Sequence, residues 1–354
     1  MKTIDARRLR GFAVALLAKG GFTAQEAEAI ADSLILSDLM GHGSHGVMRI
    51  KPYLENLKNG HVASGAALRI ERETASSVFA DAQRGVGQVI VPRILETLYD
   101  KLATQAVVTA AVRNCGHMGR IGEWVEGAAK RGFPGLLLVN DNGALLHVAP
   151  PGGKKAVTST NPIAFAIPLP GGEVFMTDMA TSAIAFGKVT LAKLGKTEVA
   201  ADCIQTAEGK PTTDPAALFT DPPGSVLPMG GAQGYKGFAI SMFVDMLVAG
   251  LSGGQTPPAP NAFKYSNSFT LTLWNPLFFA GLAHMQAEAQ KYVEFLHSSP
   301  PTDAEKPIRI PGDRMNGTRR EREKDGIPLN PGLVKGMLGL AQELGVTPPE
   351  ELAG

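Results

Sequence analysis

Apolar residues recur three and four positions apart in several long segments of the chain, which is the spacing of one buried helix face. This pattern predicts two helices within the first 40 residues and further helices over 86–105, 120–133, 237–254 and 287–297. Short apolar runs typical of strands lie between them, at 106–112, 134–140, 163–169, 174–180 and 268–275. Helix and strand alternate in the first half, so the predicted class is α/β or α+β.

Two further features of the pattern refine this prediction. From about 150 to 235, glycine and proline clusters separate the strand-like runs, which predicts a sheet with substantial antiparallel character. In the helix over 237–254 we expect Met242, Phe243, Met246 and Leu247 to lie in the core instead of on a ligand surface. No apolar run approaches the ~18 residues of a membrane span, and no membrane contact is expected.

Bulk properties exclude several classes of function. A length of 354 residues suits two domains, and 44% hydrophobic with 19% charged residues is typical of a soluble globular protein. The net charge of +1 gives no long-range field that would attract nucleic acid or an anionic membrane. Two cysteines, Cys115 and Cys203, cannot form a disulfide framework or a zinc site built on paired thiols. We therefore expect a cytoplasmic protein.

The stretch GHGSHG, residues 41–46, fits the G-x-G-x-x-G pattern of a phosphate-binding loop. That loop functions only after a strand and before a helix, where free N–H groups face the anion. Here a capping box at Thr23 to Glu26 begins a helix and Gly41 ends it, so the glycines follow a helix instead. The sequence therefore argues against a pyrophosphate loop.

Three histidines, His42, His45 and His117, are the strongest candidates for chemistry. His117 lies just beyond the apolar run 106–112, and the end of a strand commonly presents a reactive side chain. A metal site is disfavoured, because no H-E-x-x-H occurs and no cysteine or aspartate cluster accompanies these histidines. Serine nucleophile chemistry is disfavoured as well, because G-x-S-x-G is absent and Ser44 follows a helix.

Arg49 lies four residues after His45 and four before Tyr53. If the chain is helical there, all three side chains project from one face. An imidazole, a guanidinium fork and a phenol on one surface suit a small carboxylate with a neighbouring oxygen that gains or loses a proton. A solvated arginine and a half-buried tyrosine are the structural alternative.

Six ordered blocks of the sequence resemble the type-2 malate/L-lactate dehydrogenase family, the non-Rossmann NAD(P)-dependent 2-hydroxyacid oxidoreductases. The blocks are GHGSHGVMRIKPY, NCGHMGRIGEWVEGAAKRGF, TSTNPIAFAIP, TDMATSAIAFGKV, GYKGFAISMFVDML and PGDRMNGTRREREKDGIPL. They run essentially end to end and most resemble the hydroxycarboxylate dehydrogenase B type. The resemblance implies a central nucleotide domain (119–304) with a mainly antiparallel mixed sheet. It also implies a flanking substrate and dimerisation domain built from both chain ends (1–118 and 305–354), usually in a homodimer.

The resemblance also implies roles for individual residues. The catalytic positions fall on His117, His45, Arg49, Tyr53 and Ser44, with Gly43 incidental. The cofactor contacts, with NAD or NADP, fall on His45, Gly119, Arg120, Ile121, Ser159, Thr160, Asn161, Asp178, Met179, Ala180, Thr181, Lys236 and Asp313. Two departures weaken the match: the loop 140–153 fits loosely, so no role passes to Asn140 or Asp141, and Asp313 stands where relatives have glutamate.

Hydride transfer between a 2-hydroxy acid and nicotinamide needs a base, a cationic clamp and an oriented ring. We assign proton transfer to His117, the carboxylate clamp to Arg49 with help from Tyr53, and ordering of substrate and ring to His45 and Ser44. In this scheme oxidation needs a neutral imidazole and reduction needs a protonated one. Reduction of a cyclic imine by the same histidine, or an inactive nucleotide-binding protein, are the alternatives; no metal is expected.

Overall fold

A seven-stranded mixed sheet forms the centre of the protein, whose computed structural model describes residues 2–259 and 266–353. Only β3 and β4 run parallel, and every other neighbouring pair is antiparallel. A Rossmann sheet is mainly parallel, so the predicted non-Rossmann, mainly antiparallel α/β class is confirmed. In spatial order the strands are β2 (Arg69–Glu73), β3 (Ser77–Asp81), β4 (Val107–Gly116), β11 (Ser266–Trp274), β5 (Gly135–Asn140), β6 (Ile163–Pro168) and β7 (Val174–Met179).

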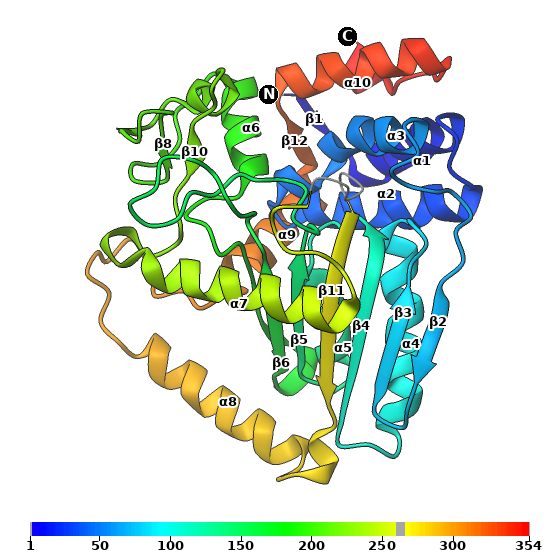
Figure 1. Cartoon of the computed structure of the whole chain (residues 1–354), viewed down its shortest axis with the longest axis vertical. Coiled ribbons are helices and arrows are strands. Elements are labelled where there is room, and N and C mark those ends of the chain that lie inside the picture. The colour runs from blue at the N-terminus through cyan, green and yellow to red at the C-terminus, as the bar shows by residue number, and fades with distance from the viewer. Residues whose placement is uncertain (1, 260–265, 354) are drawn as a thin grey trace.

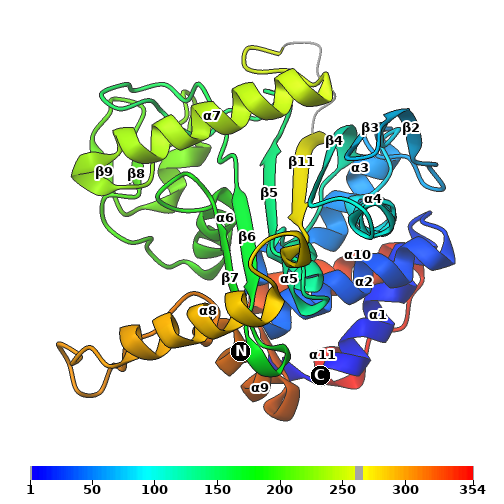
Figure 2. The ribbon, with the colours of Figure 1, turned by 90° about the horizontal axis from the view of Figure 1, so that it is seen from below.

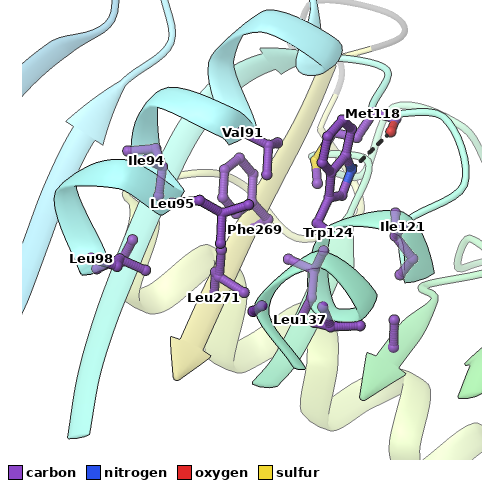
Figure 3. Packing of buried hydrophobic residues seen from close by; sticks show 14 of the residues in the cluster. Val91, Ile94, Leu95, Leu98, Met118, Ile121, Trp124, Leu137, Phe269 and Leu271 are labelled. Carbon is purple, nitrogen blue, oxygen red and sulfur yellow. Dashed lines mark hydrogen bonds between the residues drawn. The ribbon is translucent and has the colours of Figure 1, made fainter. Parts of the chain in front are cut away.

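Helices cover both faces of this sheet. In Figure 1, α7 (Tyr235–Ser252) crosses one face, and α4 (Gly87–Leu102) and α5 (Gly122–Lys130) lie behind the other. Figure 3 shows the core on the second face, where apolar side chains of α4 and α5 meet Phe269 and Leu271 of β11. Trp124 Nε1 donates a hydrogen bond of 3.1 Å to the carbonyl of Met118, which fixes the chain beyond β4 against α5.

The two ends of the chain build a second layer together. β1 (Lys2–Ile4) pairs with β12 (Ile327–Leu329), and the termini lie near each other in Figures 1 and 2. Their apolar residues share one core cluster, which confirms a flanking part assembled from both ends. Its helices are α1 (Ala6–Lys19), α2 (Ala24–Leu39), α3 (Ile50–Lys58), α10 (Pro331–Leu344) and α11 (Glu350–Ala353), with α9 (Asp313–Asp325) just before β12.

A smaller lobe lies between β7 and α7. It contains α6 (Phe186–Gly195) and a three-stranded antiparallel sheet of β8 (Ile204–Gln205), β9 (Pro211–Thr212) and β10 (Ser225–Val226). The antiparallel character expected between 150 and 235 is therefore present. The strands β2 to β4 belong to the central sheet although they precede residue 118; the predicted domain boundaries stay a prediction.

The prediction that Met242, Phe243, Met246 and Leu247 lie in the core is wrong for the first three. Met242, Phe243 and Met246 are 44%, 55% and 59% exposed, and only Leu247 packs partly against a core cluster. The helix packs on the sheet through one face, which carries residues such as Val244 and Val248. Its opposite, outward face is equally apolar, so the spacing of apolar residues does not show which of the two faces is buried. α7 is also long and apolar enough to cross a membrane, contrary to the sequence prediction, but a core helix of a soluble protein passes the same test.

Candidate active site

The glycine- and histidine-rich turn 41–46 follows α2 and leads into α3. Gly43–His45 and Val47–Arg49 form separate 3-10 turns, and Gly46 between them has extended backbone (φ −88°, ψ −153°). The spacing of His45, Arg49 and Tyr53 put them on one face only if the chain were one continuous helix, and that condition is not met, because Gly46 breaks the helix. The three side chains still face one site, since Tyr53 lies on α3 directly after the second turn.

Asp38, near the end of α2, holds this turn in place. Its Oδ2 accepts a hydrogen bond of 2.8 Å from the Val47 N–H, and burial raises its pKa to about 7. A Cβ on Gly46 would lie 1.9 Å from Asp38 Oδ1, so only glycine fits there. A Cβ on Gly43 would meet nothing closer than 3.7 Å. The motif thus depends on Gly46 for close packing, while Gly43 is incidental, as the resemblance implied.

His117 lies immediately after β4 and faces the turn. Its ring stacks on that of His45, with centroids 5.6 Å apart and an interplanar angle of 16°. Tyr53 Oη lies 2.6 Å from His117 Nδ1, although 64 residues separate the two in sequence. The structure therefore brings together His45, Tyr53 and His117; spacing related His45 to Tyr53 in the sequence, but only the resemblance linked them to His117.

Arg49 is anchored at one end and available at the other. Its Nε donates a hydrogen bond of 2.7 Å to the Ser44 carbonyl, and Ser44 Oγ lies 3.0 Å from His45 Nδ1. Across residues 2–259 and 266–353, no hydrogen bond reaches Nη1 or Nη2 of Arg49. Two free, parallel N–H groups beside the histidines can bind a carboxylate in a bidentate manner.

The electrostatics of this cluster keep its histidines neutral. Burial, with the nearby Arg49 guanidinium, lowers the pKa of His117 to about 3 and that of His45 well below its usual value. Burial also raises the pKa of the Tyr53 phenol to about 12. At neutral pH both imidazoles and the phenol are therefore uncharged, which conflicts with the expectation that a protonated His117 serves reduction.

The predicted cofactor segments converge around the start of α5. Gly119 has φ +66°, and the buried Arg120 donates from Nη2 to Glu126 Oε2 at 3.0 Å. Asp178 Oδ2 accepts a hydrogen bond of 2.7 Å from the Gly122 N–H, and Thr181 Oγ1 donates to the carbonyls of Thr160 (2.9 Å) and Asn161 (3.1 Å). These bonds place 119–122, 159–161 and 178–181 next to one another.

Unpaired buried atoms in these segments fit a polar ligand. Arg120 Nε, Arg120 Nη1 and Asn161 Oδ1 are buried without a hydrogen-bond partner. Native proteins pair nearly all such atoms, so a bound molecule with both donors and acceptors is the natural complement. A nicotinamide dinucleotide has both kinds of group.

Two predicted cofactor residues stand apart from this group. Lys236 is exposed in the first turn of α7. Asp313 begins α9, where its Oδ2 accepts from the Ile310 N–H (3.0 Å) and from His297 Nε2 (3.2 Å). Their assigned contacts stay predictions.

Sequence reasoning missed several buried polar residues around the site. Gln88 on α4 donates from Nε2 to Tyr53 Oη at 3.1 Å and is 3% exposed. Asp245 on α7 accepts from Thr158, Asn161 and Asn140. Both residues sit inside helical patterns, and no local signal marks a glutamine or aspartate there as a partner of distant side chains.

The third histidine candidate, His42, packs against α9. Its Nε2 donates to the Met315 sulfur at 3.0 Å, and burial lowers its pKa to about 3. Within the described part of the chain, no group of three His, Cys, Asp or Glu side chains is placed to hold a metal ion. The contact that the structure shows for His42 is therefore the one with Met315 of α9.

Comparison with known proteins agrees with this geometry. The sequence profile described as malate/L-lactate dehydrogenase matches residues 4–338. Hydroxycarboxylate dehydrogenase B from Escherichia coli is 34% identical, and the match covers 98% of this chain and 95% of that enzyme. Malate dehydrogenase from Pyrococcus horikoshii superposes with a TM-score of 0.87 at 29% identity, covering 98% of this chain and 97% of the other. The delta1-piperideine-2-carboxylate reductase from Pseudomonas syringae superposes with a TM-score of 0.82 at 29% identity, covering 96% and 100%. The resemblance seen in the sequence is thereby confirmed, and the chain belongs to the malate/L-lactate dehydrogenase family.

Proposed function

We propose that this protein is an NAD(P)-dependent dehydrogenase that interconverts a small 2-hydroxy acid and its 2-oxo acid. The family's name and its similar members, hydroxycarboxylate dehydrogenase B and L-lactate dehydrogenase, are of the hydroxyacid dehydrogenase type and imply a nicotinamide nucleotide. The observation that carries the finer proposal is Arg49, whose anchored Nε leaves two Nη groups free beside His117. A guanidinium fork next to an imidazole matches a carboxylate next to a carbon bearing oxygen.

Each residue has a distinct part in this proposal. Arg49 binds the substrate carboxylate, and His117 exchanges a proton with the C2 oxygen through Nε2, the ring nitrogen that has no hydrogen bond within the described residues. His45 stacks on His117 and, with Ser44, orders the substrate. The bound nicotinamide supplies the hydride in reduction and accepts it in oxidation. Arg120, Asn161 and the segments around them would hold it, through the buried atoms that lack partners.

The test is a panel of 2-oxo acids, each followed by NADH and NADPH absorbance. Turnover of at least one small oxo acid is expected, and treatment with a chelator should leave it unchanged. The same panel decides between NADH and NADPH. Cofactor binding, seen by fluorescence, without turnover of any oxo acid or imine would instead indicate an inactive nucleotide-binding protein.

Cyclic imine reduction is a second candidate, favoured by the superposition on a delta1-piperideine-2-carboxylate reductase. A cyclic imine carboxylate offers Arg49 the same carboxylate and offers His117 a nitrogen in place of oxygen. Adding such an imine to the panel decides the matter. A kcat/KM for the imine at least tenfold above that of every oxo acid would favour the reductase.

The assembly we propose is a homodimer formed through the apolar outer surface of α7 and α8 (Leu282–His297). Besides the exposed residues of α7, Leu277 and Phe295 are 76% and 72% exposed, and α8 has no buried residue. An apolar hollow of about 510 Å³ opens between α8 and the β6–β7 edge. Exposed apolar surfaces of this size mark protein interfaces.

Analytical ultracentrifugation should show a dimer for the wild type, and Met246→Glu should shift the protein toward monomer. A monomeric wild type would refute the proposal. The cytoplasmic location stays a prediction.

A further inference from the structure

The hydrogen bonds around His117 determine where its proton lies. The Gly119 backbone N–H donates to His117 Nδ1 at 3.2 Å. A backbone N–H can only donate, so Nδ1 is an acceptor and the neutral ring has its hydrogen on Nε2. Gly119 is suited to this contact, because a Cβ there would lie 3.0 Å from both Ser33 Oγ and Gln88 Nε2.

The same reasoning orients the Tyr53 hydroxyl. Its Oη lies 2.6 Å from His117 Nδ1, which has no hydrogen to give, so the phenol is the donor in this bond. With its hydrogen directed to His117, Oη can only accept from its other neighbour. Gln88 meets this requirement, since its Nε2 lies 3.1 Å from Oη while its Oε1 has no partner. The three side chains therefore form a directed chain, Gln88 to Tyr53 to His117.

We propose that Tyr53 is the second proton donor of the reaction, acting through His117, and that Gln88 is the positioning residue that directs the Tyr53 hydrogen to Nδ1. This inference rests on the proposed function and changes the part of Tyr53 from carboxylate binding to proton transfer. It also resolves how a neutral His117 can serve reduction.

The proton transfers balance without a charged imidazole. In reduction the bound nicotinamide would supply the hydride for the C2–H bond, and the C=O π electrons move to oxygen. The Nε2–H bond breaks as the O–H bond of the product forms, and the Tyr53 O–H bond breaks as Nδ1–H forms. The ring ends as the other neutral tautomer and Tyr53 ends as a phenolate. After the product leaves, Tyr53 takes back the Nδ1 proton while Nε2 takes one from water, which restores the starting state. Oxidation follows the same transfers in reverse.

The surroundings of Tyr53 support a transient phenolate. Burial raises the pKa of the phenol to about 12, and the Arg49 guanidinium together with the Gln88 N–H, which donates to its oxygen, offsets part of that rise by favouring the ionised form. An alkoxide is more basic than a phenolate, so transfer from Tyr53 to the reduced substrate runs downhill. Without Tyr53, loss of the Nε2 proton would leave an imidazolate, which is a poorer product.

The first test measures the His117 tautomer in the cofactor-free protein. ¹⁵N NMR of histidine-labelled protein at pH 7, assigned with His117→Asn, should show a neutral ring with hydrogen on Nε2. In Gln88→Glu the new carboxylate accepts from Tyr53 and turns its hydrogen away from His117, so the Nδ1 signal should move toward that of a weaker acceptor. A ring with hydrogen on Nδ1, or a charged ring, in the wild type would overturn the proposal.

The second test separates proton transfer from carboxylate binding. Tyr53→Phe should lower kcat on the order of 10²-fold and change KM by less than about threefold, whereas loss of a carboxylate clamp acts mainly on KM. A plot of wild-type kcat against the D₂O fraction in mixed H₂O and D₂O should be curved, because two protons move in the transition state. The same plot for Tyr53→Phe should be linear. Tyr99→Phe, which removes the hydroxyl of a half-buried tyrosine stacked on Phe133, is the matched control and should keep the wild-type kcat.

The outcomes also distinguish this inference from the proposed function. A wild type that reduces an oxo acid while Tyr53→Phe keeps its kcat and a curved plot against the D₂O fraction refutes only the relay. A wild type that reduces no oxo acid and no imine refutes the proposed function, and the relay with it.

Discussion

Two buried polar regions lie around the central sheet, and their hydrogen bonding differs. One consists of the turn 41–53 with His117, and the other of the segment 140–161 with Asp245 of α7. In the second, Asp245 accepts from Asn161 Nδ2 (2.6 Å), Thr158 Oγ1 (2.8 Å) and Asn140 Nδ2 (3.2 Å). In the first, Arg49 and His117 each have one anchored nitrogen and others without a hydrogen bond in the described chain.

This difference indicates which region supports the structure and which binds a ligand. Polar groups that are fully hydrogen-bonded to one another stabilise a packed arrangement, whereas groups without partners in a partly accessible cluster are available to bind a ligand. Asn161 belongs to both, since its Nδ2 joins the Asp245 network and its Oδ1 is unpaired. We infer that the Asp245 network positions the 159–161 segment and that the His117 cluster performs the chemistry.

The largest expected effect concerns the first region. His117→Ala should lower kcat by roughly 10²–10⁴, the scale of a positioned proton-transfer group, because it removes the Nε2 donor assigned to the C2 oxygen. Cofactor binding, measured by NAD(P)H fluorescence, and thermal stability should stay near wild type. If His45→Ala abolished turnover while His117→Ala kept its kcat, the proton-transfer role would belong to His45.

A stability effect is expected for the second region. Asp245→Ala removes an acceptor shared by three buried donors. Asn140 Nδ2 keeps the Gln255 carbonyl and Asn161 Nδ2 keeps Ser241. Among the described residues only Thr158 Oγ1 then loses its acceptor, so the unfolding free energy in urea should fall by ~1–3 kcal/mol. Asp32→Ala removes an exposed ion pair with Arg10 and should cost less than about 1 kcal/mol. If the Asp245 variant kept wild-type stability but lost turnover, the Asp245 network would have a role in catalysis and not only in stability.

Arg49→Lys probes recognition within the first region. Lysine keeps the charge but loses the fork, so KM should rise by the equivalent of about 1.5–3 kcal/mol, with a smaller change in kcat. Arg113→Lys alters an arginine on β4 that pairs with Glu71 and Asp81, and should leave KM unchanged. Equal KM values for Arg49→Lys and wild type on every oxo acid would place the clamp elsewhere, with Arg120 as the next candidate.

The smallest effect is expected for the pH dependence of kcat/KM in the reduction direction. The pKa of His117 is lowered to about 3 by burial and Arg49, so the ring is neutral throughout the range pH 5–9. If reduction required the protonated ring, kcat/KM would fall about tenfold for each pH unit over this range. We instead expect a slope well below one, because the neutral ring donates and Tyr53, with a pKa of about 12, stays protonated. A tenfold loss per unit would show that the charged imidazole is the donor.

The sequence by itself determined the elements and the candidate chemistry. Apolar spacing located α1, α2, α4, α5, α7 and α8, and the strands β4 to β7 and β11, close to their observed bounds. The capping box at Thr23 and the stop near Gly41 were enough to argue against a phosphate loop at 41–46. These features are local, so a few neighbouring residues suffice to specify them. Family resemblance, not periodicity, assigned the individual site residues.

Only the tertiary structure decided how those residues act. Tyr53, Gln88 and His117 lie on α3, on α4 and beyond β4, and their hydrogen bonds, which fix the His117 tautomer, form because the sheet and both chain ends pack together. The exposure of Met242, Phe243 and Met246 is likewise a property of which face of α7 meets the sheet. Neither outcome follows from local spacing, since hydrogen-bond direction and burial depend on atoms that are distant in sequence.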